Sequence, residues 1–129
     1  GHIYHISKMT SEAGRTEMAI DVDMREMQAR ADEISSLLKL LSHPTRLLIA
    51  CELRKGEASV SALEDATGAT QSNLSRDLGR MREEGLIAAR RQSKSVYYRL
   101  ADDRLARVID ALCAAFGAKP RKPGRRAGS

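Results

Sequence analysis

Two short helical segments separated by a glycine constrain the fold of this chain more than any other feature. The first segment, residues 59–67, begins at a serine suited to cap a helix, and Gly68 follows in the turn. The second segment begins at Thr70, another capping residue, and ends before Gly85. Its apolar side chains recur at helical spacing, at Leu74, Leu78 and Met81. Two helices joined by such a turn form a helix-turn-helix, and we predict that motif here.

The outward positions of the second helix carry side chains of one chemical kind. They are short or forked hydrogen-bonding groups near the helix N-terminus: Gln71, Ser72, Ser75 and Arg76. Such groups can reach base edges in a DNA major groove. A helix with leucines inward and this set outward is difficult to explain as a plain surface helix. We therefore predict that these four residues bind DNA, together with Thr70 and Arg80 of the same helix.

Two strand-like segments follow the second helix. Residues 86–91 and 95–100 flank a tight basic loop, and the second segment is rich in β-branched and aromatic residues. A β-hairpin directly after a recognition helix is a wing. Three basic residues lie along it, Arg91, Lys94 and Arg99, and we expect them to contact phosphates or a minor groove. Such contacts fix the position of a protein on DNA and do not read its sequence.

Three further helices complete a mainly α class, with five helices and the two-stranded hairpin. Residues 21–41 carry an apolar stripe at Met24, Met27, Ala31, Ile34, Leu38 and Leu41. Its heptad-like spacing suits a partner helix, and the alternative is that it covers the chain's own core. After the break at Pro44, residues 44–54 place Leu47, Leu48 and Cys51 on one face. The last helix, about 102–116, has Leu105, Val108, Ile109, Leu112 and Phe116 on one face.

The charge of the chain is divided unevenly. The net charge is +5, and the last thirteen residues alone hold five basic residues and no acid, so residues 1–116 are neutral overall. Within them, residues 70–100 hold seven basic and three acidic residues, a net +4. One basic segment on a neutral body favours a single face that meets phosphate, although solvated surface is the alternative. We expect a disordered or cloning-derived segment at 1–20, one DNA-binding and dimerisation domain at 21–116, and a basic flexible tail at 117–129.

Other functional classes find little support in the sequence. No run of about 18 apolar residues indicates a membrane helix, and no secretory signal is evident, so we expect a cytoplasmic protein. There is no phosphate-binding Gly-rich loop, no nucleophile elbow and no Cys/His constellation, so we expect no enzymatic activity and no cofactor. A winged helix that binds only protein stays possible, because fold alone does not decide function.

About two thirds of the chain, residues 34–116, resembles the ArsR/SmtB family of winged-helix repressors. The segments that carry the resemblance are residues 40–49 (LLSHPTRLLI), 55–60 (KGEASV), 71–75 (QSNLS), 85–87 (GLI) and 97–100 (YYRL). The resemblance implies a homodimer joined through the first and last helices, a palindromic operator with two half-sites, and release of DNA when an inducer binds. One departure is Asp77, where the family commonly has His. We expect Asp77 to pair with Arg80 one turn on, or to accept a hydrogen bond from cytosine.

Metal sensing has few candidate ligands in this sequence. Family metal sensors use a Cys-x-Cys pair on the helix that holds Cys51, or Asp and His ligands on the last helix. Here Glu52 and Leu53 follow Cys51, and the last helix has no His. Two thiols without a nearby imidazole are too few for a tetrahedral zinc site, so we predict no metal site, and only a soft two-coordinate ion stays open.

The two cysteines are the remaining candidates for sensing. Cys51 and Cys113 are small enough to be buried core residues, a common fate of free cysteine. The branch that the chain most resembles is the thiol-based, reactive-sulfur-responsive BigR/SqrR-like one, which implies persulfide or polysulfide chemistry at both positions and a small thiol-reactive inducer. That branch places its second cysteine about one turn later, near Gly117. Whether the thiols bridge directly, through extra sulfur atoms or not at all stays open. We expect Cys51 to be the more nucleophilic, because Arg54 and Lys55 follow it closely.

Overall fold

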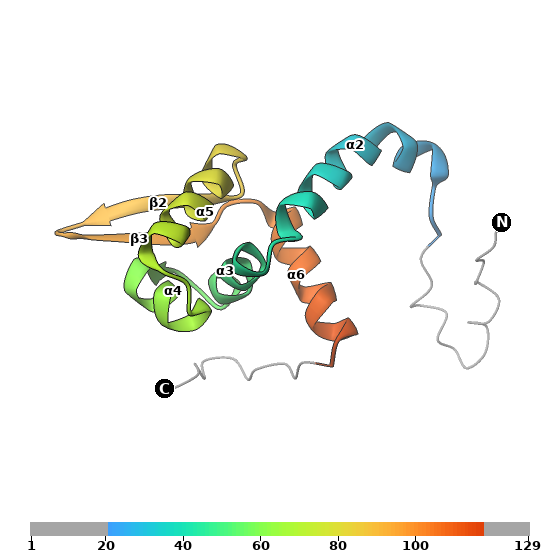
Figure 1. Ribbon diagram of the computed structural model, residues 1–129. Helices are drawn as coiled ribbons and strands as arrows, with labels where there is room; N and C mark the ends of the chain where they lie inside the picture. Colours follow the sequence, from blue (N-terminus) through green and yellow to red (C-terminus); the bar gives the residue numbers. More distant parts are fainter. Residues whose placement is uncertain (1–20, 118–129) are drawn as a thin grey trace. The chain divides into compact units, whose positions relative to one another are not determined.

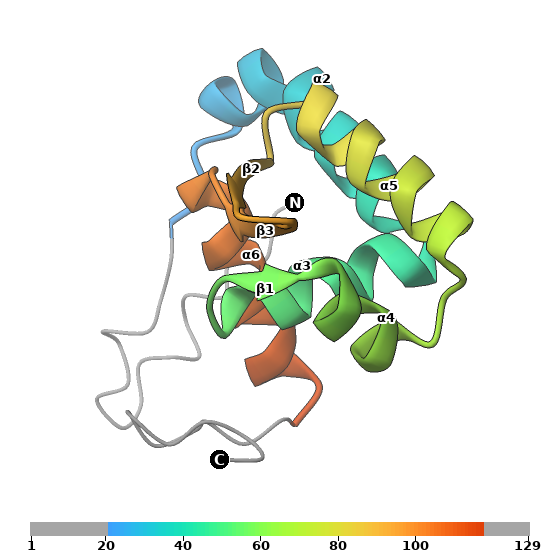
Figure 2. The same ribbon diagram turned by 90° about the vertical axis from the view of Figure 1, so that its left-hand side faces the viewer.

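The computed structural model describes residues 21–117. They form α2 (Met24–Leu41), α3 (Pro44–Arg54), β1 (Ala58–Ser59), α4 (Val60–Thr67), α5 (Gln71–Glu83), β2 (Ile87–Gln92), β3 (Ser95–Leu100) and α6 (Asp103–Ala115); Figure 1 labels all of them but β1, which is labelled in Figure 2. The chain divides into two units, residues 1–37 and 38–129, which are described separately. The predicted disordered segment at 1–20 lies outside the described residues, as does all but Gly117 of the predicted tail. The single domain at 21–116 stays a prediction.

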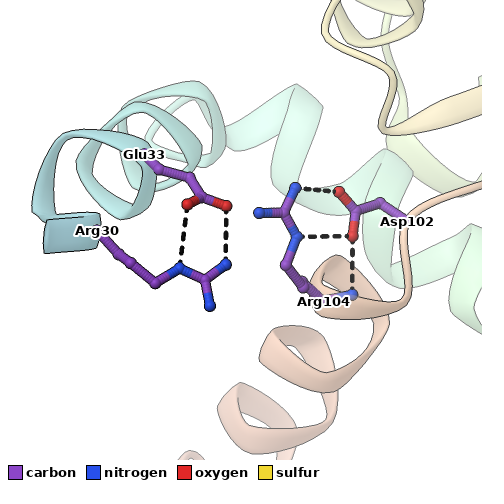
Figure 3. Close-up of polar contacts among 4 residues, drawn as sticks. All are labelled: Arg30, Glu33, Asp102 and Arg104. Carbon is purple, nitrogen blue, oxygen red and sulfur yellow. Dashed lines mark hydrogen bonds and ion pairs between the residues drawn. The ribbon is translucent and has the colours of Figure 1, made fainter. Parts of the chain in front are cut away.

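The described part of the first unit is most of helix α2. The helix begins after Asp23, whose carboxylate accepts a hydrogen bond from the backbone N–H of Arg25 at 3.0 Å. This bond satisfies one of the donors that a helix N-terminus leaves free. One turn of the helix is joined by an ion pair between Arg30 and Glu33 at 3.0 Å (Figure 3). The predicted stripe is exposed at Met24 and Met27.

In the second unit, α4 and α5 form the predicted helix-turn-helix (Figure 2). Ser59 caps α4, because its hydroxyl accepts a hydrogen bond from the backbone N–H of Ala62 at 3.1 Å. Gly68 ends α4 with a φ of 73°, a left-handed conformation that glycine adopts without strain. Thr70 caps α5 in the same manner, accepting from the N–H of Asn73 at 3.2 Å. Both predicted caps are confirmed.

The sheet has one strand more than predicted. β2 and β3 form the antiparallel hairpin of the wing, which projects from the helices in Figure 1. The short strand β1 pairs with β3 on its other side, with Ala58 opposite Tyr98. Two residues carry too little periodicity to reveal a strand in the sequence, and β1 exists because it pairs with β3. It fixes the hairpin to the segment between α3 and α4.

The core of the second unit lies between the helices and the base of the hairpin. Its fully buried side chains are Ile49, Leu63, Leu74, Leu78, Met81, Leu105 and Ile109. The inward face predicted for α3 is wrong, because Ile49, Ala50 and Leu53 are buried whereas Leu48 is 43% exposed. Phe116 is also not part of the core, since it is 84% exposed just after α6. No helix within residues 21–117 is both long and apolar enough to cross a membrane.

Candidate nucleic-acid interface and thiol pair

The outer face of α5 presents the four polar side chains that the sequence singled out. Gln71, Ser72, Ser75 and Arg76 are all exposed, and they occupy the first two turns of the helix. The inward side of the same helix is held by Leu74, Leu78 and Met81, each at most 2% exposed. Arg76 forms no ion pair with another described residue. This face therefore has free hydrogen-bonding groups on a helix fixed from behind.

Arg80 and Asp77 do not lie as the sequence suggested. Arg80 approaches Glu84 at 3.9 Å, toward the C-terminal end of α5. Asp77 is only 4% exposed and faces the interior, where its carboxylate accepts a hydrogen bond from Arg46 of α3 at 3.1 Å. Both expectations for Asp77 are therefore wrong: it pairs with neither Arg80 nor a base, because it lies on the inward side of the recognition helix.

The basic residues of the wing are distributed over both faces of the hairpin. Arg91 lies opposite Val96, whereas Arg99 lies opposite Ala88, three residue pairs nearer the base of the hairpin. Successive residues of a strand point to opposite faces, and an odd number of residue pairs separates Arg91 from Arg99. The two side chains therefore point to opposite faces of the hairpin. Lys94 lies in the two-residue turn at the tip. All three are exposed, and none forms an ion pair within residues 21–117.

Arg99 lines an open cavity of about 440 Å³ at the base of the hairpin. The charged groups around this cavity are largely paired with one another or with neighbours. Arg54 binds Asp110, and Asp102 binds Arg104 at 2.6 Å at the start of α6 (Figure 3). The position of Arg99 thus differs from that of Arg91 and Lys94, although the sequence grouped the three.

Arg90 holds the hairpin to the loop before β1, a contact that was not predicted from the sequence. Its guanidinium donates two hydrogen bonds of 2.8 Å to the carboxylate of Glu57 and lies 4.9 Å from the centre of the Tyr97 ring. The hydrogen bond from Arg90 also lowers the pKa of Glu57. Because 33 positions separate the two residues, local spacing cannot predict the pair. Arg90 therefore fixes the hairpin and is not free for phosphate.

The two cysteines come from helices α3 and α6, which pack against each other. Cys51 is half-buried and Cys113 is exposed, and both are free thiols. Burial raises the pKa of Cys51, and the nearby Cys113 raises it further, whereas Lys55 lowers it to a smaller extent. Burial thus opposes the lowering of the Cys51 pKa by Lys55, and the greater nucleophilicity of Cys51 stays a prediction.

An ion pair lies one helical turn from the thiols. Arg54 donates two hydrogen bonds of 2.8 Å to the carboxylate of Asp110, joining α3 to α6. Arg54 follows Cys51 by three residues, and Asp110 precedes Cys113 by three. Each cysteine therefore lies about one helical turn from a contact that joins α3 to α6. The pair also engages the guanidinium that was expected to lower the pKa of Cys51.

No cluster of three or more His, Cys, Asp or Glu side chains suited to a metal ion occurs in the part of the chain that the structure describes. A structural zinc site requires four ligands of this kind. The two thiols alone could hold only an ion that accepts two ligands. Their chemistry as a pair is otherwise that of thiols, with sulfur as the attacking atom.

Known proteins are similar to this chain in both sequence and fold. Residues 43–89 match the family described as "Bacterial regulatory protein, arsR family". A biofilm growth-associated repressor of Agrobacterium fabrum is 46% identical over 96 residues, covering 74% of this chain and 82% of the relative.

Two solved structures support the same assignment. The transcriptional repressor BigR from Xylella fastidiosa has a TM-score of 0.72 at 42% identity, over 76% of this chain and 100% of that one. A homodimeric winged helix-turn-helix DNA-binding domain from Mycobacterium bovis has a TM-score of 0.60 at 31% identity, over 77% and 90% of the two chains. On the strength of its sequence, its winged helix and these relatives, the chain belongs to the arsR family of bacterial regulatory proteins.

Proposed function

We propose that this protein is a homodimeric transcriptional repressor whose affinity for a palindromic operator is controlled by modification of Cys51 and Cys113. The observation that carries the proposal is the position of the two thiols on packed helices, each one helical turn from the Arg54–Asp110 contact that joins α3 to α6. A covalent bridge between them would tie together two helices that packing and the Arg54–Asp110 ion pair now join. The BigR-like relatives, named as repressors, support the assignment to repression.

In the reduced state α5 would lie in the major groove. Gln71, Ser72, Ser75 and Arg76 would face base edges, with Thr70 at the helix N-terminus beside a phosphate. Arg91 and Lys94 of the wing would contact the backbone of the flanking DNA. Two copies related by a two-fold axis would place their recognition helices about 34 Å apart, on successive major grooves. The homodimeric relative from Mycobacterium bovis supports this arrangement.

Modification would act on DNA binding through α3. This helix packs against α6, which carries Cys113, and also against the recognition helix α5. A bridge that changes the distance between α3 and α6 would move α3 relative to α5 or α5 relative to its twin in the dimer. DNA is released if the bridged state no longer fits both half-sites. Modification then shifts the population from the DNA-binding state to the bridged state.

The chemistry requires an oxidant of the sulfane-sulfur class, such as inorganic disulfane, HSSH. One cysteine thiolate attacks a sulfur of disulfane, the S–S bond breaks, and HS⁻ leaves, forming a cysteine persulfide. The second thiolate attacks the cysteine sulfur of that persulfide and displaces a second HS⁻, giving a disulfide. The net reaction converts two thiols and one HSSH into one disulfide and two H2S. If a further disulfane extends the persulfide before ring closure, sulfur atoms are retained in the bridge.

The first experiment is a titration of operator DNA, selected in vitro from random sequence with the reduced protein. Fluorescence anisotropy would report affinity for protein that is reduced, treated with polysulfide, treated with peroxide or loaded with a metal ion. Intact mass would identify each modification. We expect polysulfide to weaken operator binding and to add a bridge whose mass gives its number of sulfur atoms. Cys51→Ser and Cys113→Ser variants should remain bound after the same treatment.

Other outcomes assign the function differently. If a metal ion releases DNA and thiol treatment does not, the protein is a repressor released by a soft metal, and the cysteines are structural. If the wild-type protein selects no sequence and binds all DNA alike, operator recognition through α5 is excluded.

A further inference from the structure

Asp77 is the one charged residue that is buried among residues 21–117, and operator reading does not account for it. It lies on α5, one residue after Arg76 and on the opposite side of the helix from the base-reading face. A buried carboxylate is costly unless it is paired and hydrogen-bonded. Its partner is Arg46, and the two side chains are only 6% and 12% exposed.

Arg46 joins three segments of the second unit. It lies in the first turn of α3, its Nε donates a hydrogen bond of 2.7 Å to the backbone carbonyl of Leu40, and its Nη1 donates to Asp77 at 3.1 Å. The carbonyl of Leu40 is in the last turn of α2, where helix carbonyls lack partners within the helix. One guanidinium therefore holds the end of α2, the start of α3 and the middle of α5. Its planar fork fixes the directions of these bonds.

The other contacts that hold α5 are of a different kind. Leu74, Leu78 and Met81 are buried apolar side chains, and burial of apolar surface has no directional preference. Such contacts hold a helix against a core but tolerate small rotations about its axis and small shifts along it. Hydrogen bonds to base edges tolerate less, because they weaken steeply outside a narrow range of distance and angle. Discrimination between operators therefore needs a directional contact behind α5.

We propose that the Arg46–Asp77 pair is a positioning device that sets the rotation and depth of the recognition helix and thereby its discrimination between operator and other DNA. The pair touches no base. It acts through α5, whose exposed Gln71, Ser72, Ser75 and Arg76 must meet the bases in register. Contacts to phosphate depend mainly on charge and less on register, so non-specific affinity should not depend on the pair. This inference rests on the proposed recognition of DNA through α5.

The test compares two affinities for each variant, for the selected operator and for a scrambled duplex at the same salt concentration. The ratio of the two is a property of the folded protein, because a loss of folded molecules lowers both apparent affinities equally. The main variant is Arg46→Met with Asp77→Leu, since apolar residues of similar volume often replace a buried ion pair without loss of stability. Asp77→Asn is a second variant that preserves shape and removes the charge.

We expect the specificity ratio of the double variant to fall at least about tenfold, with affinity for scrambled DNA unchanged. Asp77→Asn should give a smaller fall in the same direction. The matched control removes an exposed Arg–Asp pair within α6, as Arg107→Gln with Asp103→Asn, and should change neither affinity. A ratio equal to that of the wild type in both test variants would overturn the inference and leave the pair a contributor to stability only. If the wild type itself shows no discrimination, the recognition of DNA through α5 fails, which is a separate result.

Discussion

At the scale of single residues, the turn of the wing contains a serine in a conformation that favours glycine. Ser93 has a φ of 57° and is the first residue of the two-residue turn between β2 and β3. Such turns favour glycine at that position, because a side chain there meets the following carbonyl. We expect Ser93→Gly to raise the free energy of unfolding by about 0.5 kcal/mol, the relief of strain exceeding the entropy that glycine loses on folding.

Urea denaturation followed by circular dichroism measures this effect. Ser95→Gly is the matched control, since Ser95 lies in β3 two residues later and its backbone has no positive φ. There glycine should destabilise by about 0.5 to 1 kcal/mol. If both changes destabilise alike, the backbone at Ser93 carries no strain.

The ionisation of Cys51 gives a second prediction at this scale. Burial raises the pKa of its thiol, so at neutral pH less of it is thiolate than in an unfolded chain. We expect iodoacetamide to alkylate Cys51 more slowly in the folded Cys113→Ser variant than in the same variant in urea. The rate in the folded protein should continue to rise with pH beyond the point at which the unfolded chain levels off. Mass spectrometry of samples quenched from about pH 7 to about pH 10 checks both rates.

The raised pKa of Cys51 also predicts how the stability of the protein depends on pH. A thiol whose pKa is raised by folding contributes stability that is fully present below its ordinary pKa. This contribution is lost as the pH rises through the raised value. Equal alkylation rates in the folded and unfolded chain, at every pH, would contradict a buried Cys51.

At the scale of elements, local sequence signals located most of the helices and the hairpin. Caps at Ser59 and Thr70, Pro44 at the start of α3 and the apolar period of α5 are all local, and each of these helices begins at the predicted residue or within one of it. Predictions failed where a long-range contact decides the outcome. The face of α3 turns inward at Ile49 because of what packs against it, and no period within eleven residues reveals that choice.

The same distinction separates the predicted parts of the site from the missed ones. The exposed face of α5 follows from its own sequence, since its polar and apolar residues alternate with the helical period. The pairs of Arg46 with Asp77, Arg54 with Asp110 and Arg90 with Glu57 join residues 31, 56 and 33 positions apart. Charge pairing over such separations depends on the tertiary fold, so the sequence predicted none of these three pairs and led to other roles for Asp77 and Arg54.

The wing gives a prediction about an element, because its two faces carry separate cations. We expect Arg91→Ala to weaken binding to operator and to scrambled DNA by a similar factor. The logarithm of the association constant falls linearly with the logarithm of the salt concentration. Arg91→Ala should make this slope less steep by about 0.9, the value of one phosphate contact. Lys94→Ala should act in the same way, since Lys94 lies at the tip of the hairpin.

Arg99→Ala is the matched control on the other face of the hairpin. It removes the same charge from the protein and should leave the slope unchanged. Anisotropy titrations at four or more salt concentrations would measure all three slopes. An equal loss of slope in Arg99→Ala would place Arg99 at the phosphate backbone, as the sequence suggested, and would mean that both faces of the wing meet DNA.

At the scale of the whole molecule, we expect net charge to determine the affinity for DNA of any sequence. We expect the symmetry of the dimer to determine discrimination between sequences. The last thirteen residues hold five basic residues and no acid, and a charge of that size attracts DNA of any sequence in a salt-dependent manner. In the proposed dimer, discrimination between sequences would depend instead on two recognition helices held at a fixed separation. Removal of residues 118–129 should therefore weaken binding to operator and scrambled DNA alike, and changes in half-site spacing should affect the operator alone.

The spacing of half-sites is the most direct test of a rigid dimer. Insertion of about five base pairs between the half-sites turns one of them by about half a helical turn, so the second α5 faces the wrong side of the duplex. We expect affinity for this DNA to fall to that of a single half-site with flanking scrambled sequence. The control replaces the same central base pairs without changing their number, and it should retain most of the operator affinity, because α5 does not reach them. Anisotropy titration and the molar mass of each complex would report affinity and the number of chains bound. If the inserted DNA binds two chains as tightly as the operator, the subunits bind independently, and a bridge at Cys51 and Cys113 would have to act within one chain on the α3–α5 contact.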